Sequence, residues 1–362
     1  MKPQTSNFKP QTSNFKVLYR LVRPLFFACP PEAMHVFVAG LMRFVYCIPP
    51  LRALVRAIFT VKHPALEREF CVLKFSNPVG LAAGFDKNAT LYSAFSILGF
   101  SFVEIGTVTP KGQPGNPKPR LFRIVQDDAL INRMGFNNEG VDAAVKQLKR
   151  KRPDIVIGGN IGKNTATSND DAPADYLKCF KKLYPYVDYF TLNLSCPNVA
   201  NLTELQNISS LTKILTAVLS ERDLMERRKP VLLKISPDIS FEHLDDILEI
   251  IEQMGVDGIV AVNTTIKRND LSIGQEQIAH LGAGGLSGKP LTQRALETVN
   301  YIRQRTKGQL PVMGAGGIMT AEDAVNMIHA GATLVQVYTG FIYEGPSLAK
   351  NINRAIANPD YS

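Results

Sequence analysis

The stretch of sequence that decides the fold is TLNLSCPN, residues 191–198. It ends an apolar run that starts at Val187, a pattern typical of a strand buried on both faces. Pro197 lacks a backbone N–H and has a fixed φ, so it ends the strand and holds Cys196 in a stiff turn. These carboxamide, hydroxyl and thiol groups suit a planar, hydrogen-bonding substrate and a proton-abstracting sulfur. A buried cysteine in an ordinary turn is the alternative.

Short apolar segments alternate with segments of helical periodicity on both sides of this strand. The eight expected strands are residues 79–83, 102–106, 155–160, 188–193, 231–235, 258–263, 311–315 and 334–338. The expected helices are residues 91–98, 141–149, 174–183, 208–226, 241–254, 292–305, 321–329 and 347–356. Apolar strands that alternate with helices imply a parallel sheet covered by helices. Eight such units predict an α/β fold, the (β/α)8 TIM barrel, with reactive groups at the carboxyl ends of the strands.

Glycines gather after the last three expected strands, in residues 282–288, 314–317 and 338–340. Glycine lets backbone N–H groups approach a phosphate closely, and the loops after strands seven and eight form the usual phosphate site of this barrel. A doubly wound sheet, the competing fold, would carry its glycine-rich loop after the first strand. The glycines therefore favour the barrel and a phosphate-bearing ligand, with tight turns alone as the alternative.

Polar side chains follow most of the other expected strands, and they are Lys87, Thr107, Asn160, Lys234, Asn263, Thr264 and Thr265. The long loop after the second strand adds Arg120, Arg123 and residues 132–138. A lysine buried at a strand end is costly unless an anion neutralises it. Two lysines among many asparagines predict a site for a polar heterocycle with a carboxylate. The chain carries no metal-binding, nucleoside-triphosphate or Cys-x-x-Cys motif, so we expect no metal.

The first 62 residues differ from the rest. The heptapeptide KPQTSNF occurs at residues 2–8 and again at 9–15, and we expect a disordered tail over residues 1–15. Residues 16–62 show helical spacing of apolar residues. Nine basic residues and one acid precede residue 67, which accounts for nearly all of the formal net charge of +9. No apolar run reaches the roughly 20 residues that span a bilayer, so this basic segment is expected to lie on a membrane surface rather than to bind nucleic acid. Five widely spaced cysteines predict no disulfide framework and a reducing, cytoplasmic setting.

The motifs together resemble dihydroorotate dehydrogenase, the FMN enzyme of pyrimidine biosynthesis, in its membrane-associated, quinone-reducing class 2. The resemblance runs from about Leu18 to the C-terminus and rests on NPVGLAAGFDKN, EIGTVTPKGQPGNPKPRLFR, INRMGFNN, GGNIGKN, NTT, GGLSGKPL and GAGGI. It implies oxidation of (S)-dihydroorotate to orotate, with electrons passed through one non-covalent FMN to a membrane quinone. It also implies a peripheral protein on the cytoplasmic side of the cell membrane, for which we expect a monomer or a weak oligomer. Residues 16–62 would then form a quinone tunnel, and residues 63–362 the catalytic barrel.

The resemblance also implies roles for matching residues, with Cys196 as the catalytic base. The residues implied to bind FMN are Ala83, Gly84, Lys87, Thr107, Asn160, Asn193, Lys234, Val262, Gly288, Gly317, Tyr338 and Thr339. The residues implied to bind dihydroorotate are Lys87, Asn132, Arg133, Met134, Gly135, Phe136, Asn193, Asn198, Asn263 and Thr264. His35 and Arg123 would lie near the inner end of the quinone tunnel.

One residue departs from the class 2 pattern, because class 2 enzymes usually have serine at the base position, whereas soluble class 1 enzymes have cysteine. A class 1-like enzyme that uses fumarate or another soluble acceptor is therefore the nearest alternative. More distant alternatives are a dihydropyrimidine-type reductase, a phosphate-binding barrel isomerase or lyase without flavin, and a membrane adaptor without activity. Quinone remains the expected acceptor, because soluble class 1 chains lack the basic amphipathic segment and this form of the loop from Arg120 to Asn138.

Overall fold

The computed structural model describes residues 14–150, 155–195, 198, 205, 207–269 and 271–358. Cys196 and Pro197, with most of the turn they belong to, lie outside the described residues. So do residues 1–13 of the repeated tail, and the first helix begins at Asn14.

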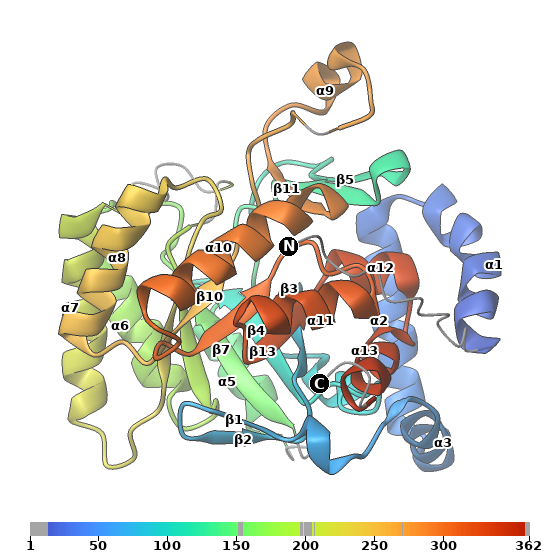
Figure 1. Cartoon of the computed structure of the whole chain (residues 1–362), viewed down its shortest axis with the longest axis horizontal. Coiled ribbons are helices and arrows are strands. Elements are labelled where there is room, and N and C mark those ends of the chain that lie inside the picture. Colours follow the sequence, from blue (N-terminus) through green and yellow to red (C-terminus); the bar gives the residue numbers. More distant parts are fainter. Residues whose placement is uncertain are drawn as a thin grey trace.

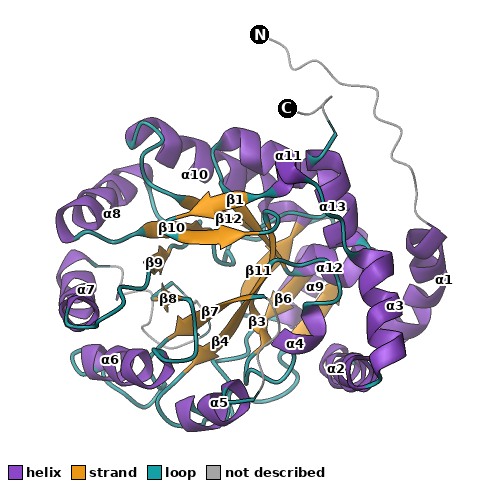
Figure 2. Cartoon of the chain, turned by 90° about the horizontal axis from the view of Figure 1, so that it is seen from below, coloured by secondary structure: helices purple, strands orange, loops and turns teal. Residues whose placement is uncertain are grey.

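Eight parallel strands close into a barrel, in the spatial order β10-β12-β13-β3-β4-β7-β8-β9 (Figures 1 and 2). Their bounds are β3 Val79–Asp86, β4 Phe102–Val108, β7 Val156–Ile161, β8 Tyr189–Asn193, β9 Val231–Lys234, β10 Gly258–Ala261, β12 Val312–Ala315 and β13 Leu334–Val337. Each of the eight expected strands is one of these, and the predicted TIM barrel is confirmed. The register places Asn160 beside Thr191 and Asn193 beside Lys234, so polar strand ends meet at one rim of the barrel.

Helices surround the barrel, as the alternation of apolar strand segments with segments of helical periodicity predicted (Figure 2). They are α4 Tyr92–Phe95, α5 Val141–Leu148, α6 Ala172–Leu183, α7 Ile208–Asp223, α8 Phe241–Met254, α10 Thr292–Arg305, α11 Ala321–Ala330 and α13 Leu348–Ile356. The helices α8 and α10 begin and end at the predicted residues. The helix α4, which was predicted over residues 91–98, is a single turn. Two short helices were not expected, α9 Gln275–Leu281 and α12 Thr339–Glu344.

A three-stranded antiparallel sheet stands above the rim where the strands end, and the sequence did not predict it. It consists of β5 Leu121–Ile124, β6 Ala129–Asn132 and β11 Gly285–Gly288, in the order β11-β6-β5. The segment that holds β11 was expected to be only a glycine-rich loop. Glycine is a poor strand former, and β11 exists because its four residues pair with β6, from Gly285 opposite Asn132 to Gly288 opposite Ala129. This sheet brings Asn132 over the barrel opening.

A short hairpin closes the opposite end of the barrel (Figure 1). Its strands are β1 Arg68–Phe70 and β2 Leu73–Phe75. Phe70 and Phe75 pack with Phe102 and Tyr189 from the barrel in one apolar cluster, and the rings of Phe75 and Phe102 lie 5.3 Å apart edge to face. The base of the barrel is therefore filled, and the cavity described below lies at the other end.

Three helices precede the barrel and lie together along one side of it (Figure 1). They are α1 Asn14–Ala28, α2 Pro31–Cys47 and α3 Pro49–Phe59. Within the described part of the chain, no single helix is long and apolar enough to cross a membrane; α2 and α3, which meet at 107°, meet that test only as a bent pair. Large apolar side chains on α1 and α2 are exposed, among them Leu21, Leu25, Phe37 and Phe44.

Two sets of polar contacts fix these helices to the barrel. On α1, the Tyr19 hydroxyl donates to the Ile342 carbonyl at 2.6 Å and the Arg23 guanidinium donates to the Tyr343 carbonyl at 3.1 Å. On α2, Glu32 accepts two hydrogen bonds from Arg120, at 2.7 and 3.3 Å. The N-terminal helices are thus held by α12 and by the loop that leads into β5.

Candidate active site

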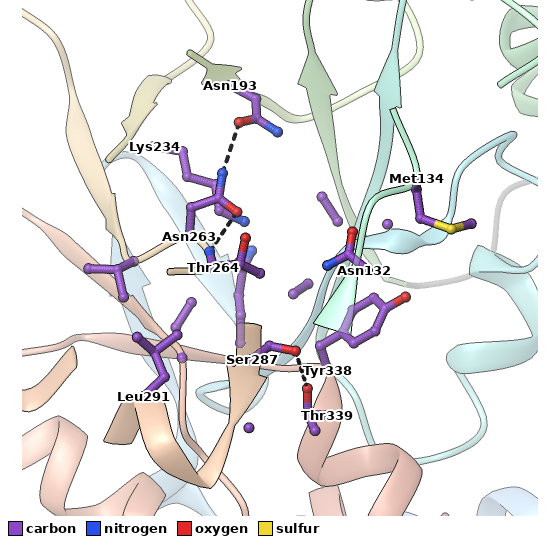
Figure 3. A pocket seen from close by; sticks show the side chains of 18 of the residues that line it. Asn132, Met134, Asn193, Lys234, Asn263, Thr264, Ser287, Leu291, Tyr338 and Thr339 are labelled. Carbon is purple, nitrogen blue, oxygen red and sulfur yellow. Dashed lines mark hydrogen bonds between the residues drawn. The ribbon is translucent and has the colours of Figure 1, made fainter. Parts of the chain in front are cut away.

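A cavity of about 150 Å³ opens at the carboxyl ends of the barrel strands (Figure 3). Most of the expected ligand-binding residues line it, and these are Ala83, Gly84, Lys87, Thr107, Asn132, Met134, Gly135, Phe136, Asn193, Asn198, Lys234, Val262, Asn263, Thr264, Gly288, Gly317, Tyr338 and Thr339. Residues from seven of the eight barrel strands or their following loops, and from the upper sheet, therefore meet in one place.

Amide side chains form a connected row along one wall. The Asn193 amide donates to the Thr107 hydroxyl at 2.9 Å and to the Asn160 side-chain oxygen at 3.3 Å. Asn263 donates to the Asn193 oxygen at 3.2 Å and accepts from the Thr264 backbone N–H at 2.9 Å (Figure 3). These groups offer several fixed donors and acceptors to a polar ring.

A second pair of amides joins the upper sheet to the turn after β8. Asn198 donates to the Asn132 side-chain oxygen at 3.0 Å and accepts from the Gly285 N–H at 3.1 Å. Its carbonyl accepts from Asn116 at 3.0 Å. Asn198, two residues after the expected base in the sequence, is therefore connected to β6, to β11 and to the loop before β5.

Lys87 is placed by the turn that follows β3. The buried Asp86 carboxylate accepts three backbone N–H bonds, from Thr90, Leu91 and Tyr92, which fixes this turn. The Lys87 ammonium donates to the Gly84 carbonyl at 2.7 Å. Burial lowers the pKa of Lys87 to about 8, against a smaller opposite effect from Glu32, because a charged ammonium is poorly solvated there. An anionic ligand would stabilise its charged form.

Small residues surround the lower end of the cavity. Gly288 and Gly317 both have positive φ, +102° and +70°, a conformation that glycine adopts without strain. The hydroxyls of Ser287 and Thr339 lie 2.8 Å apart at this end (Figure 3). None of the described residues that line this cavity is acidic. The backbone N–H groups and hydroxyls at this end can therefore bind an anion.

A second cavity, of about 350 Å³, lies between the N-terminal helices and the barrel. Its walls are mostly apolar and come from α1, α2, α3, α4 and α12. Among the described residues, Lys87, Met134 and Tyr338 line both cavities, so the two cavities adjoin at these side chains. Such a space suits a flat, apolar ligand whose head group approaches the first cavity.

His35 and Arg123, the two residues implied to lie at the quinone tunnel, both line this second cavity. The His35 ring lies against the Phe85 ring with 4.9 Å between centroids. Burial, and then the charge of Lys87, lower the pKa of His35 to about 4. Arg123 donates to the carbonyls of Phe27 and Cys29, at 3.2 and 2.7 Å, and its guanidinium lies over the Phe27 ring.

Among the described residues, two expected ones are absent from the lining of the first cavity. Asn160 is fully buried behind Thr107 and Asn193 and contacts the cavity only through them. The Arg133 guanidinium points away, because it donates to the carbonyls of Leu281 and Ala283 and lies over the Phe122 ring. Cys196 lies outside the described residues, but its neighbour Ser195 is buried and accepts a hydrogen bond from Asn263 at 3.0 Å.

Several lining residues were not singled out from the sequence, including Ser287, Leu291 and Gln336. Ser287 lies within the GGLSGKPL motif, so this motif could have identified Ser287 as a lining residue. Gln336 stands in the middle of β13, and the alternation of side chains along a strand could have placed it on the inner face.

The fold and the cavity define the general class first: a (β/α)8-barrel enzyme with its site at the carboxyl ends of the strands. The family model for dihydroorotate dehydrogenase matches residues 65–359. Dihydroorotate dehydrogenase (quinone) from Christiangramia forsetii is 50% identical over 336 residues, which are 93% of this chain and 97% of that protein. The protein of the same name from Mycobacterium tuberculosis is 45% identical over 340 residues, 94% of this chain and 93% of that one.

A solved structure agrees with these relatives. The crystal structure of DHODH in complex with ferulenol from Eimeria tenella matches with a TM-score of 0.81 and 36% identity, and the match covers 93% of each chain. The chain belongs to the dihydroorotate dehydrogenase family.

Proposed function

We propose that this protein oxidises dihydroorotate to orotate and passes the electrons to a quinone, a step of de novo pyrimidine (UMP) biosynthesis. One observation carries the proposal: a cavity that presents asparagine, threonine and lysine side chains at the strand ends adjoins an apolar cavity under the N-terminal helices, and Lys87, Met134 and Tyr338 line both. A polar heterocycle suits the first cavity and a quinone suits the second. The names of the relatives from Christiangramia forsetii and Mycobacterium tuberculosis include the same acceptor.

One FMN per chain would occupy the first cavity. Two buried side-chain oxygens in its wall, Thr264 Oγ1 and Gln336 Oε1, have no hydrogen-bond partner among the described residues, which favours a polar ligand beside them. The turns at Gly288, Gly317 and Thr339 would hold its phosphate, and Thr107, Asn193 and Lys234 its ring. When bound, FMN would take up hydride from dihydroorotate and supply electrons to the quinone.

The remaining polar groups would hold dihydroorotate. Lys87 would pair with its carboxylate, and Asn132, Asn198 and Asn263 would bond its ring amides. Arg133 would contribute through its backbone alone, since its guanidinium is engaged by Leu281 and Ala283. Cys196, two residues before Asn198 in the sequence, would accept the C5 proton, because a thiolate forms far more readily than an alkoxide.

The apolar cavity would admit the quinone from a membrane. Leu18, Leu21 and Leu25 on α1 and Val36, Phe37 and Phe44 on α2 expose apolar surface beside basic residues. A protein that lies on the cytoplasmic face of the cell membrane with these helices in the interface would bury that surface. His35, held uncharged by burial, would then meet the quinone head group without adding charge.

The test is dihydroorotate oxidation in mild detergent with a quinone or fumarate as the sole electron acceptor. We expect a yellow protein that turns over with the quinone and not with fumarate. Turnover with fumarate alone would assign the chain to the soluble-acceptor class and make the second cavity irrelevant to catalysis. A colourless protein with neither activity would contradict the flavin proposal as well.

A further inference from the structure

A buried carboxylate lies behind the row of amides. Glu104, on β4, is fully buried inside the barrel and lines neither cavity. One of its oxygens accepts from the Asn160 amide at 2.7 Å. The other accepts from Gln336 at 2.8 Å, from Thr191 at 3.0 Å and from Tyr189 at 3.2 Å.

The carboxylate imposes a direction on the amides in front of it. Carboxylate oxygens only accept hydrogen bonds, so Asn160 turns its NH2 group toward Glu104 and its oxygen toward the site. That oxygen accepts from the Thr107 hydroxyl at 2.6 Å and from Asn193 at 3.3 Å. Asn193 is thereby turned so that its own oxygen faces Asn263.

At the other end of the row of amides, the Thr264 backbone N–H imposes the same orientation. The Asn263 oxygen accepts from the Thr264 N–H, which cannot turn, so the Asn263 NH2 group faces Asn193. All three amides therefore point the same way between Glu104 and a backbone N–H. The two ends of an amide have nearly the same shape, so packing alone does not select the orientation; hydrogen-bond partners do.

This direction matters because Thr107, Asn193 and Asn263 line the cavity. The orientation of the amides determines which groups of the cavity wall donate hydrogen bonds and which accept them. It therefore determines which tautomer of a ligand ring can bind, and which edge of that ring faces the wall. A site of reversed polarity would leave buried donors facing donors, which costs binding free energy. Four donors compensate Glu104 for its burial, so the barrel can hold this charge behind the site.

We propose that Glu104 is a positioning residue that sets the donor and acceptor polarity of the ligand cavity through Asn160. The inference rests on the proposed function, since the FMN ring at Thr107 and Asn193 and the ring amides of dihydroorotate or orotate at Asn263 are the ligand groups that would match these donors and acceptors. Glu104 itself touches neither ligand. The competing account is that Glu104 stabilises the barrel and has no effect on the site.

The first variant is Glu104→Gln, which replaces one acceptor oxygen with a donor and leaves the shape unchanged. The orientation of Asn160 is then no longer unique, and we expect orotate to bind about tenfold more weakly by calorimetry, as one mispaired buried hydrogen bond predicts. Because Thr107 and Asn193 would also hold the FMN ring, FMN should bind more weakly as well, so orotate is titrated with FMN in excess and the bound FMN is read from the visible spectrum. The kcat/KM for dihydroorotate should fall in parallel.

The second variant, Glu104→Gln with Asn160→Asp, exchanges the carboxylate and the amide across the same hydrogen bond. It keeps the net charge and again presents acceptors to Thr107 and Asn193, so most of the lost orotate affinity should return. Tyr189→Phe is the matched control, because it removes one donor from the other Glu104 oxygen and leaves Asn160 paired. It should lower the melting temperature without changing orotate affinity.

Orotate affinity in Glu104→Gln equal to that of the unmodified protein would overturn the proposal. So would a double variant as impaired as the single one, because the order of donors and acceptors would then be irrelevant. Failure of the proposed function would look different, since the unmodified protein itself would neither bind orotate nor oxidise dihydroorotate.

Discussion

Lys87 lines both cavities, and its charge state should be visible in the pH dependence of catalysis. Its pKa is lowered to about 8 by burial, so the ammonium is charged below that pH and neutral above it. We expect kcat/KM for dihydroorotate to fall as the pH rises through about 8, because the substrate carboxylate loses its partner. Lys87→Arg should remove this alkaline fall, since guanidinium stays charged. A profile that is flat to about pH 10 in the unmodified protein would contradict the assignment.

Cys196 should determine the acidic limb of the pH profile, where the rate of flavin reduction rises with pH. A thiol has a reference pKa of about 8.5, far below that of a serine hydroxyl, so proton abstraction should reach its plateau at lower pH than in a serine-containing relative. We expect Cys196→Ser to move the rise in the rate of flavin reduction to higher pH. Cys196→Ala should abolish that reduction and keep the flavin bound. An unchanged pH profile in Cys196→Ser would remove Cys196 from the role of base.

At the scale of single residues, the sequence predicted which side chains line the cavity where a side chain follows a barrel strand. Lys87, Asn193 and Lys234 were found because strand ends of a parallel barrel share one rim. The sequence could not show that Arg133 turns away, because the carbonyls that attract it belong to a distant segment around Leu281. It also could not place Asn160 behind Thr107, which depends on how three strands pack together.

At the scale of secondary structure, the α2 helix depends on its ion pair with the barrel. Arg120 lowers the pKa of Glu32, first by its hydrogen bonds, against a smaller effect of burial. The unfolded state therefore takes up a proton at higher pH than the folded state. The stabilisation is complete above the ordinary value of 4.5 and is lost as the pH falls through the lower folded pKa.

Glu32→Gln should loosen α2 at neutral pH. A charge-assisted hydrogen bond typically contributes about 1.5–3 kcal/mol, so amide hydrogen exchange in α2 should become up to about a hundredfold faster, while α8 keeps its rates. Glu226→Gln is the matched control, because Glu226 is exposed near the end of α7. Equal exchange in α2 for both variants would mean that apolar contacts alone hold the helix.

The elements that the sequence missed share one physical feature. β11 and its partner β6 are short, and their pairing joins segments more than 150 residues apart, so no local pattern marks them. The barrel strands and helices were predictable because each carries its own apolar period. The glycines of β11 were correctly noted, but they were interpreted only as a loop.

At the scale of the whole molecule, the exposed apolar face of α1 should decide membrane binding. Leu21 and Leu25 are 71% and 70% exposed, so Leu21→Glu with Leu25→Glu should not affect folding. We expect this variant to lose flotation with vesicles that contain anionic lipid, and to reduce membrane-embedded quinone more slowly. Reduction of the flavin by dihydroorotate should not change.

Leu224→Glu is the control for this pair, because Leu224 is also highly exposed, at 81%, but follows α7, on the side of the barrel opposite α1 (Figure 1). It should float with vesicles as the unmodified protein does. Flotation of the α1 double variant would place the membrane contact elsewhere.

The β1–β2 hairpin at the base of the barrel has a consequence for the order of assembly during synthesis. The hairpin emerges from the ribosome before any barrel strand, yet Phe70 and Phe75 pack against residues as late in the chain as Val260, Met313 and Leu334. Its aromatic rings can contact Phe102 and Tyr189 earlier, but they stay partly uncovered until the last strands have been translated. A nascent chain that stalls after β9 would expose this apolar hairpin, and it is the segment on which a chaperone would be expected to act first.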